Sequence, residues 1–162
     1  MLKPPIEKAL NEQLKEEMNS FYIYLSMSAY FESKGFRGMA SWMAKQANEE
    51  FTHAMKFFGY IHERGGSVTL QALDKPKAKW ASPVEAFKAA AEHEKHISAC
   101  IDTLVDAATA QRDHATANFL QWFVKEQVEE EATVDAIVQR FALGGEQPVG
   151  LLFLDRELGG RQ

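Results

Sequence analysis

The chain has 162 residues, with 23 acidic side chains against 18 lysines and arginines and a formal net charge of −5. Its length suits one domain with a sizeable core, and 46% hydrophobic and 25% charged residues form an ordinary globular composition. The acidic balance and the lack of a basic cluster argue against nucleic-acid binding, and no apolar run is long enough to cross a bilayer.

The N-terminal sequence and the cysteine content indicate where the protein works. The first ten residues, MLKPPIEKAL, lack the apolar stretch of a signal peptide. Cys100 is the only cysteine, which excludes an intrachain disulfide and a paired-cysteine zinc site. We therefore expect a soluble, cytoplasmic protein.

The first half of the chain has two helical patterns. Apolar residues recur in steps of three and four up to a turn at Gly35, which predicts a first helix. They are Ile6, Leu10, Leu14, Met18, Phe21 and Leu25. A second helix is predicted from about Met39 to Arg64, where the following glycines can end it. Residues 67–82 show no sustained helical period, and we expect a long connection with a little extended structure.

The second half has clear helix start signals. Ser82, Pro83 and Glu85 form one such signal, which predicts a third helix to about Gln111. Asp113 can cap a fourth helix that continues to about residue 143. A short apolar segment after Pro148 predicts a stub helix over about 148–158.

Four long helices and one short helix indicate an all-α protein. The short first and third links make each pair of helices antiparallel, while the middle link is long enough to travel the length of the bundle. We expect a four-helix bundle over about 5–143, with one long crossover and a short fifth C-terminal helix, in a single domain of residues 1–162.

Each long helix interrupts its apolar face with a carboxylate near the middle of its length. The four are Glu17, Glu50, Glu94 and Glu130. One such acid alone usually lies at the edge of the apolar face and reaches water, and a single buried histidine is usually a satisfied core residue. Four acids meeting in one core would repel each other and lose their hydration, and a bound cation resolves both problems.

The spacing and chemistry of these residues indicate which metal would bind. Glu50 and His53 are three positions apart and face the same way on a helix. Oxygen and nitrogen ligands without a thiolate favour iron or manganese over a structural zinc ion. The sequence therefore predicts an intrasubunit metal site.

Three segments carry a resemblance to a known family. They are LNEQLKEEMNSFYIYLSMSAYF, ANEEFTHAMKFFGYIHERGG and FLQWFVKEQVEEE, together with Glu94. With these segments, the chain resembles the bacterial non-haem ferritins, of the ferritin-like di-iron family, over nearly its whole length. The resemblance implies iron storage and detoxification: a ferroxidase oxidises Fe²⁺ to Fe³⁺ with O₂ or H₂O₂, and the mineral collects in a hollow shell of 24 subunits.

The resemblance also implies roles for particular residues. Glu17, Glu50 and His53 would hold one iron, and Glu50 would bridge to a second iron. The second iron would be held by Glu94 and Glu130, with Gln127 close by. Tyr24 matches a tyrosine beside the centre, and its alternative role is a packed core tyrosine. A possible third iron site matches Glu49, Glu126 and Glu129, whose alternative role is a solvated acidic face.

Two departures from related patterns refine the expectation. Gln127 and Glu130 stand where a second Glu-x-x-His would complete the site, so the second iron should bind more weakly, as suits iron in transit. The similar bacterioferritins keep that histidine and carry a haem-binding methionine. Position 52 here is threonine and the nearest methionine is Met55, so no haem is expected.

Two other classes of protein use similar bundles. A rubrerythrin-like peroxidase or another di-iron oxidase would need a second redox site or a substrate pocket, and the chain lacks the Cys-x-x-Cys pairs of rubredoxin-type domains. A DNA-protecting mini-ferritin lacks the terminal helix and binds metal between subunits.

The other histidines, His62, His93, His96 and His114, are expected on the surface, and no role is assigned to Cys100. The sequence leaves open the preferred oxidant, the oxidation rate, the pores that admit iron, the mineral nucleation site and the partner that releases iron.

Overall fold

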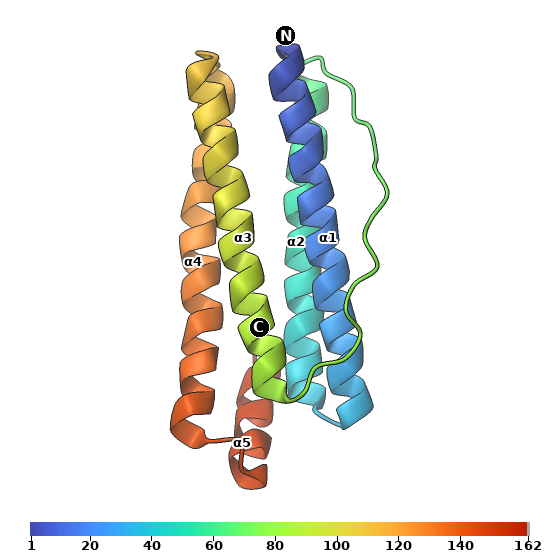
Figure 1. Cartoon of the computed structure of the whole chain (residues 1–162), viewed down its shortest axis with the longest axis vertical. Coiled ribbons are helices and arrows are strands. Elements are labelled where there is room, and N and C mark those ends of the chain that lie inside the picture. Colours follow the sequence, from blue (N-terminus) through green and yellow to red (C-terminus); the bar gives the residue numbers. More distant parts are fainter. Residues whose placement is uncertain (162) are drawn as a thin grey trace.

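The computed structural model describes residues 1–161, which form five helices and no strand (Figure 1). The helices are α1 (Pro4–Lys34), α2 (Arg37–Glu63), α3 (Pro83–Ala110), α4 (His114–Gly144) and α5 (Pro148–Gly159). The four long helices lie side by side, and α1–α2 and α3–α4 are antiparallel hairpins. The expected all-α four-helix bundle with one long crossover and a short terminal helix is confirmed. None of its helices is both long and apolar enough to cross a membrane, within the residues described.

The predicted helix ends agree with the structure to within two residues. The Ser82 side chain accepts a hydrogen bond from Glu85 N at 3.4 Å, and Asp113 accepts one from Thr116 N at 3.1 Å. Each of these side chains satisfies a backbone N–H that has no partner within its helix. Gly35 has a φ of +82°, the left-handed conformation that ends α1.

The crossover connection runs along the length of α1 (Figure 1). The expected long connection is present, and no strand forms within residues 67–82. Side chains of α1 satisfy the connection's backbone instead. Asn11 Oδ1 accepts from Thr69 N at 2.7 Å, and Asn19 Oδ1 accepts from Asp74 N at 3.2 Å. Without a partner strand, these contacts hold the connection against the bundle.

The buried face of α1 differs in part from the apolar series in the sequence. Leu25 is 42% exposed, whereas Glu17, Tyr24 and Met27 are buried. A helix turns 100° per residue, so the series of steps drifts off the inner face after Leu14. The inner face of α1 therefore becomes polar at the middle of the bundle.

The interior consists of two apolar clusters. One contains the second half of the α1 core, the first half of the α2 core and residues such as Phe87 and Phe141. The other contains the opposite halves, with Leu10, Phe57 and Phe123. On every long helix the carboxylates predicted to meet lie between these clusters in sequence. The bundle is thus apolar at both ends and polar in the middle.

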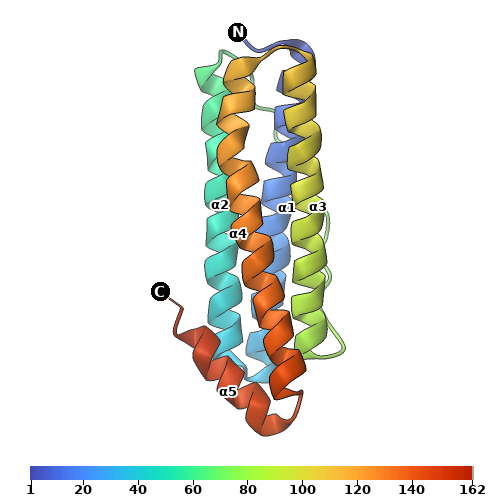
Figure 2. The same cartoon turned by 90° about the vertical axis from the view of Figure 1, so that its left-hand side faces the viewer.

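The short helix α5 crosses the end of the bundle from α4 to α2 (Figure 2). Asp155 of α5 accepts a hydrogen bond from Met39 N at 2.8 Å, near the start of α2. Gly38 permits this approach, because a Cβ at that position would lie 1.7 Å from the Asp155 carbonyl oxygen. The inner side of α5 buries Leu154 and Leu158.

Candidate metal centre

The polar middle of the bundle holds two overlapping groups of metal-ligating side chains. Glu17, Glu50 and His53 place one donor atom each within 4.8 Å of one another, and Glu50, Glu94 and Glu130 do the same. All five side chains are buried, and they come from all four long helices. Glu50 belongs to both groups, so its two oxygens can serve two neighbouring cations.

His53 lies beside the carboxylates of its own hairpin. Its Nδ1 lies 3.3 Å from an oxygen of Glu50 and 4.0 Å from an oxygen of Glu17. That oxygen of Glu17, Oε2, is buried without a hydrogen-bond partner. A buried carboxylate oxygen without a partner is costly, and a cation would satisfy it.

Two glutamines on the first hairpin hold three of the carboxylates in place. Gln46 donates to Glu130 at 2.7 Å and to Glu50 at 3.2 Å, so it links two helices. Gln13 donates to Glu17 at 2.9 Å. Sequence reasoning assigned no role to these two, although each lies four residues before a predicted ligand and therefore on the same helix face.

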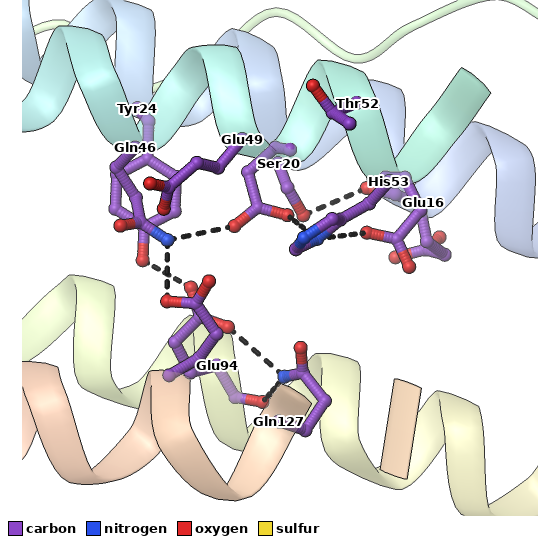
Figure 3. Close-up of polar contacts among 12 residues, drawn as sticks. Glu16, Ser20, Tyr24, Gln46, Glu49, Thr52, His53, Glu94 and Gln127 are labelled. Carbon is purple, nitrogen blue, oxygen red and sulfur yellow. Dashed lines mark hydrogen bonds and ion pairs between the residues drawn. The ribbon is translucent and has the colours of Figure 1, made fainter. Parts of the chain in front are cut away.

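Gln127 and Tyr24 both contact Glu94 (Figure 3). Gln127 Nε2 donates to Glu94 Oε2 at 3.1 Å, and the Tyr24 hydroxyl donates to Glu94 Oε1. The Tyr24 hydroxyl therefore touches a candidate ligand. In this arrangement Gln127 directs its amide nitrogen, which cannot bind a cation, toward the centre.

The expectation of a surface position is wrong for His93, which is partly buried beside the centre. Its Nε2 lies 2.7 Å from Ser20 Oγ, and its ring meets the Tyr24 ring edge-on. His62, His96 and His114 are exposed as expected. His93 was missed because it precedes Glu94 and falls one position off the apolar face.

Crowding of buried acids changes their protonation. Burial, and then the charge of Glu50, raise the pKa of Glu94 to about 8 and that of Glu130 to about 7. Burial raises the pKa of Glu17 well above its usual range. Burial alone would lower the pKa of His53, but the hydrogen bond and charge of Glu50 raise it to about 9. The metal-free centre therefore stores protons that an incoming cation can displace.

The acids of the expected third iron site lie at the edge of this centre. Glu126 forms a group with His53 and Glu130. Glu49 pairs with Arg161 at 2.6 Å, and Glu129 lies 3.9 Å from Lys125. Within residues 1–161, Glu49, Glu126 and Glu129 do not converge as one group of three. Arg161 also donates to Gln46 Oε1 at 2.9 Å, so the C-terminal segment reaches the inner edge of the centre.

Thr52 and Met55 lie on the outside of α2. Thr52 is exposed, and its hydroxyl donates to the Asn48 carbonyl at 3.0 Å. Met55 is also exposed. Both positions point away from the buried centre.

Comparisons with known proteins agree on one family. Residues 7–143 match the family described as the ferritin-like domain. The chain is 45% identical to the bacterial non-heme ferritin of Bacteroides fragilis (strain 638R), over 99% of this chain and 100% of that protein. It is 37% identical to the bacterial non-heme ferritin of Escherichia coli O157:H7, over 98% of this chain and 96% of that protein. It superposes on the open pore ferritin of the archaeon Archaeoglobus fulgidus with a TM-score of 0.98 and 47% identity, covering 100% of this chain and 99% of that one.

Proposed function

The chain belongs to the ferritin family, and we propose that its ferroxidase centre is the buried cluster of Glu17, Glu50, His53, Glu94 and Glu130. The protein is an iron-storage ferroxidase: it oxidises Fe²⁺ and stores the product. The observation that carries the residue assignment is the pair of overlapping ligand groups that share Glu50.

Two adjacent cations suit the chemistry of iron oxidation. Two Fe²⁺ ions each lose one electron, and O₂ takes up both electrons and two protons to form H₂O₂. With H₂O₂ as the oxidant, the same two electrons and two protons yield two water molecules. Carboxylates favour Fe³⁺ because it is the harder and more highly charged ion, so the buried acids promote the oxidation.

The two iron positions differ in their ligands. The first has the imidazole of His53, while the second has Glu94 and Glu130 beside the amide of Gln127. The second ion therefore binds more weakly and leaves readily, which suits iron on its way to a mineral. Tyr24 holds Glu94 through its hydroxyl and supports the second position.

A third iron position at Glu49, Glu126 and Glu129 is part of the proposal. Its use requires Glu49 to leave the ion pair with Arg161 and Glu129 to leave Lys125. Both pairs are partly exposed, and exposed pairs contribute little stability. Iron arriving at these acids would displace the two cationic side chains.

We propose that residues 1–162 form a single domain, that 24 copies assemble into a hollow cytoplasmic shell, and that O₂ or H₂O₂ is the oxidant. The assembly is supported by the full-length match to bacterial non-heme ferritins. The exposed apolar side chains of α5 also support it, because such a patch is normally covered by another subunit.

The test is aerobic titration of the metal-free protein with Fe²⁺, following the ferric absorbance. Glu50→Gln removes a charge shared by both ligand groups and should slow the first oxidation by about tenfold or more. Glu32→Gln is the control, since Glu32 is exposed on α1. The wild type should oxidise about two or three irons per chain rapidly and then continue into a soluble mineral.

Two results would contradict the proposal. Oxidation that stops after the first few irons would indicate a di-iron enzyme in place of a storage protein. Equal rates in Glu50→Gln and the wild type would show that the reaction occurs elsewhere.

A further inference from the structure

A second cluster of ligating side chains lies outside the iron centre, in the groove between α1 and α3. Glu16 comes from α1, and His96 and Cys100 come from α3. His96 Nε2 lies 2.8 Å from Glu16 Oε2 and 3.6 Å from Cys100 Sγ. The three donor atoms are within 4.8 Å of one another.

The ring nitrogen Nε2 of His96 cannot satisfy both Glu16 and Cys100 at once. Both contacts of His96 use the same ring nitrogen, Nε2. If Nε2 carries a proton, it donates to Glu16 and offers no acceptor to the thiol. If it carries none, its lone pair faces the Glu16 carboxylate oxygen. A cation bound by all three atoms removes this conflict, because each atom then donates a lone pair to the same ion.

The spacing fits a small tetrahedral ion. Bonds of about 2.1 Å to nitrogen and about 2.3 Å to sulfur place those two atoms about 3.6 Å apart at a tetrahedral angle. The observed separation of Nε2 and Sγ is 3.6 Å. A ligating oxygen would lie about 3.4 Å from the nitrogen. Glu16 therefore has to withdraw by about half an ångström, which a long and partly exposed side chain can do.

The sequence positions support the same geometry. His96 and Cys100 are four residues apart, so they project from one face of α3. Glu16 faces them from α1, next to the iron ligand Glu17 but on another side of the helix. Ligands from two helices would make the bound ion a cross-link between the hairpins.

Two cavities border the site formed by Glu16, His96 and Cys100. A cavity of about 540 Å³ is lined by Glu16 and Cys100, and another of about 460 Å³ by Glu16 and His96. Three protein ligands leave the fourth tetrahedral position open to water or another small ligand.

We propose that Glu16, His96 and Cys100 form a second metal site, for a borderline divalent cation of the Zn²⁺ class, separate from the iron centre. This site includes a thiolate, whereas the iron centre has only oxygen and nitrogen ligands. The thiolate favours Zn²⁺ or Co²⁺ over Mg²⁺ or Ca²⁺. The bound ion ties α1 to α3.

Cobalt is the probe, used with the assembled iron-free protein under anaerobic conditions. Because Cys100 is the only cysteine, a thiolate-to-Co²⁺ charge-transfer band can arise only from this site. The wild type should show that band, with the intense visible absorption of tetrahedral cobalt, and its amplitude should saturate as Co²⁺ is added. Added Zn²⁺ should abolish the band and slow the alkylation of Cys100.

Variants separate this site from the iron centre. Cys100→Ser should abolish the band, and His96→Gln and Glu16→Gln should weaken Co²⁺ binding by about tenfold or more. Glu50→Gln should leave the band unchanged while iron oxidation falls, so the two assignments fail independently. His114→Gln is the control, because His114 is an exposed histidine at the start of α4.

Three results would overturn the proposal. One is the absence of a charge-transfer band in the wild type at saturating Co²⁺. Another is equal Co²⁺ affinity in the wild type, His96→Gln and Glu16→Gln, which would mean that the cysteine binds alone. The last is alkylation of Cys100 at the same rate with and without Zn²⁺.

Discussion

At the scale of single residues, the centre is a set of acids whose charges the fold alone does not balance. Glu94 and Glu130 sit beside Glu50 in a buried space, and burial raises the pKa of both. Gln46 and Gln127 provide hydrogen bonds, but they bring no positive charge. The metal-free protein therefore keeps part of the cluster protonated, at a cost in stability that depends on pH.

The raised pKa values predict how the stability of the metal-free protein changes with pH. Between the unfolded value of 4.5 and the folded values of about 7 and 8, the folded chain holds more protons than the unfolded chain. Stability from these two groups is complete below about pH 4.5 and is lost as the pH rises to about 8. In the presence of a chelator, the melting temperature should therefore fall between about pH 5 and about pH 8.

A double variant provides the matched comparison. Glu94→Gln with Glu130→Gln cannot change its protonation at these positions, so its melting temperature should vary less over the same range. Thermal denaturation followed by circular dichroism measures both proteins. The same pH dependence in both would show that other groups control it.

At the scale of helices, much of the fold follows from local signals in the sequence. Ser82 and Asp113 marked the starts of α3 and α4 because their side chains bond backbone N–H groups a few residues away. The path of the crossover was less predictable, since Asn11 and Asn19 hold it through contacts more than fifty residues apart in the chain. The cap on α2 was hidden for the same reason, because it comes from Asp155.

The candidate centre was predictable to a similar extent. Four acids interrupt the apolar face of a helix, so the sequence of each helix alone was enough to predict its acid. They are Glu17, Glu50, Glu94 and Glu130. Gln13 and Gln46 are polar side chains whose role depends on a partner, and only the three-dimensional structure shows that partner. His96 and Cys100 lie off the apolar faces and gain a common neighbour, Glu16, only when α1 packs against α3.

The contact between α5 and α2 predicts a stability effect. Asp155→Ala removes the acceptor for Met39 N and should destabilise the subunit by about 1 kcal/mol, as the loss of a helix cap usually does. Glu157→Ala is the control on the same helix, because its ion pair with Arg140 is exposed and should contribute little. Chemical denaturation measures both. In addition, the Met39 amide should exchange with solvent faster in Asp155→Ala only, and unchanged exchange would contradict the capping role.

At the scale of the whole molecule, the outer side of α5 exposes large apolar side chains to solvent. Leu152 is 64% exposed and Phe153 is 68% exposed, and Leu143 and Val149 are exposed nearby. Leu143, Val149 and Phe153 line one hollow, where α4 turns into α5. An apolar patch of this kind indicates a contact with other copies of the chain.

The proposed assembly predicts a particle mass and a variant that lowers it. Twenty-four chains of 18.3 kDa give a shell of about 440 kDa, which light scattering measures directly. Phe153→Asp should produce smaller particles while the helical content stays the same, because Phe153 is mostly exposed within the subunit. Glu146→Gln is the control at an exposed polar position in the same region. A wild-type mass near that of 12 chains or a dimer would contradict the 24-subunit shell.

In the proposed centre, the division of the ligands between two hairpins makes the chemistry depend on folding. The α1–α2 hairpin contains Glu17, Glu50 and His53, while Glu94 and Glu130 belong to the other hairpin. A chain with only the first hairpin formed has the proposed ligands for one iron, and a single Fe²⁺ supplies a single electron. Paired electron transfer begins only when the second hairpin docks. Rapid iron oxidation therefore counts correctly folded subunits, and it can serve as a measure of refolding yield that helical content alone does not give.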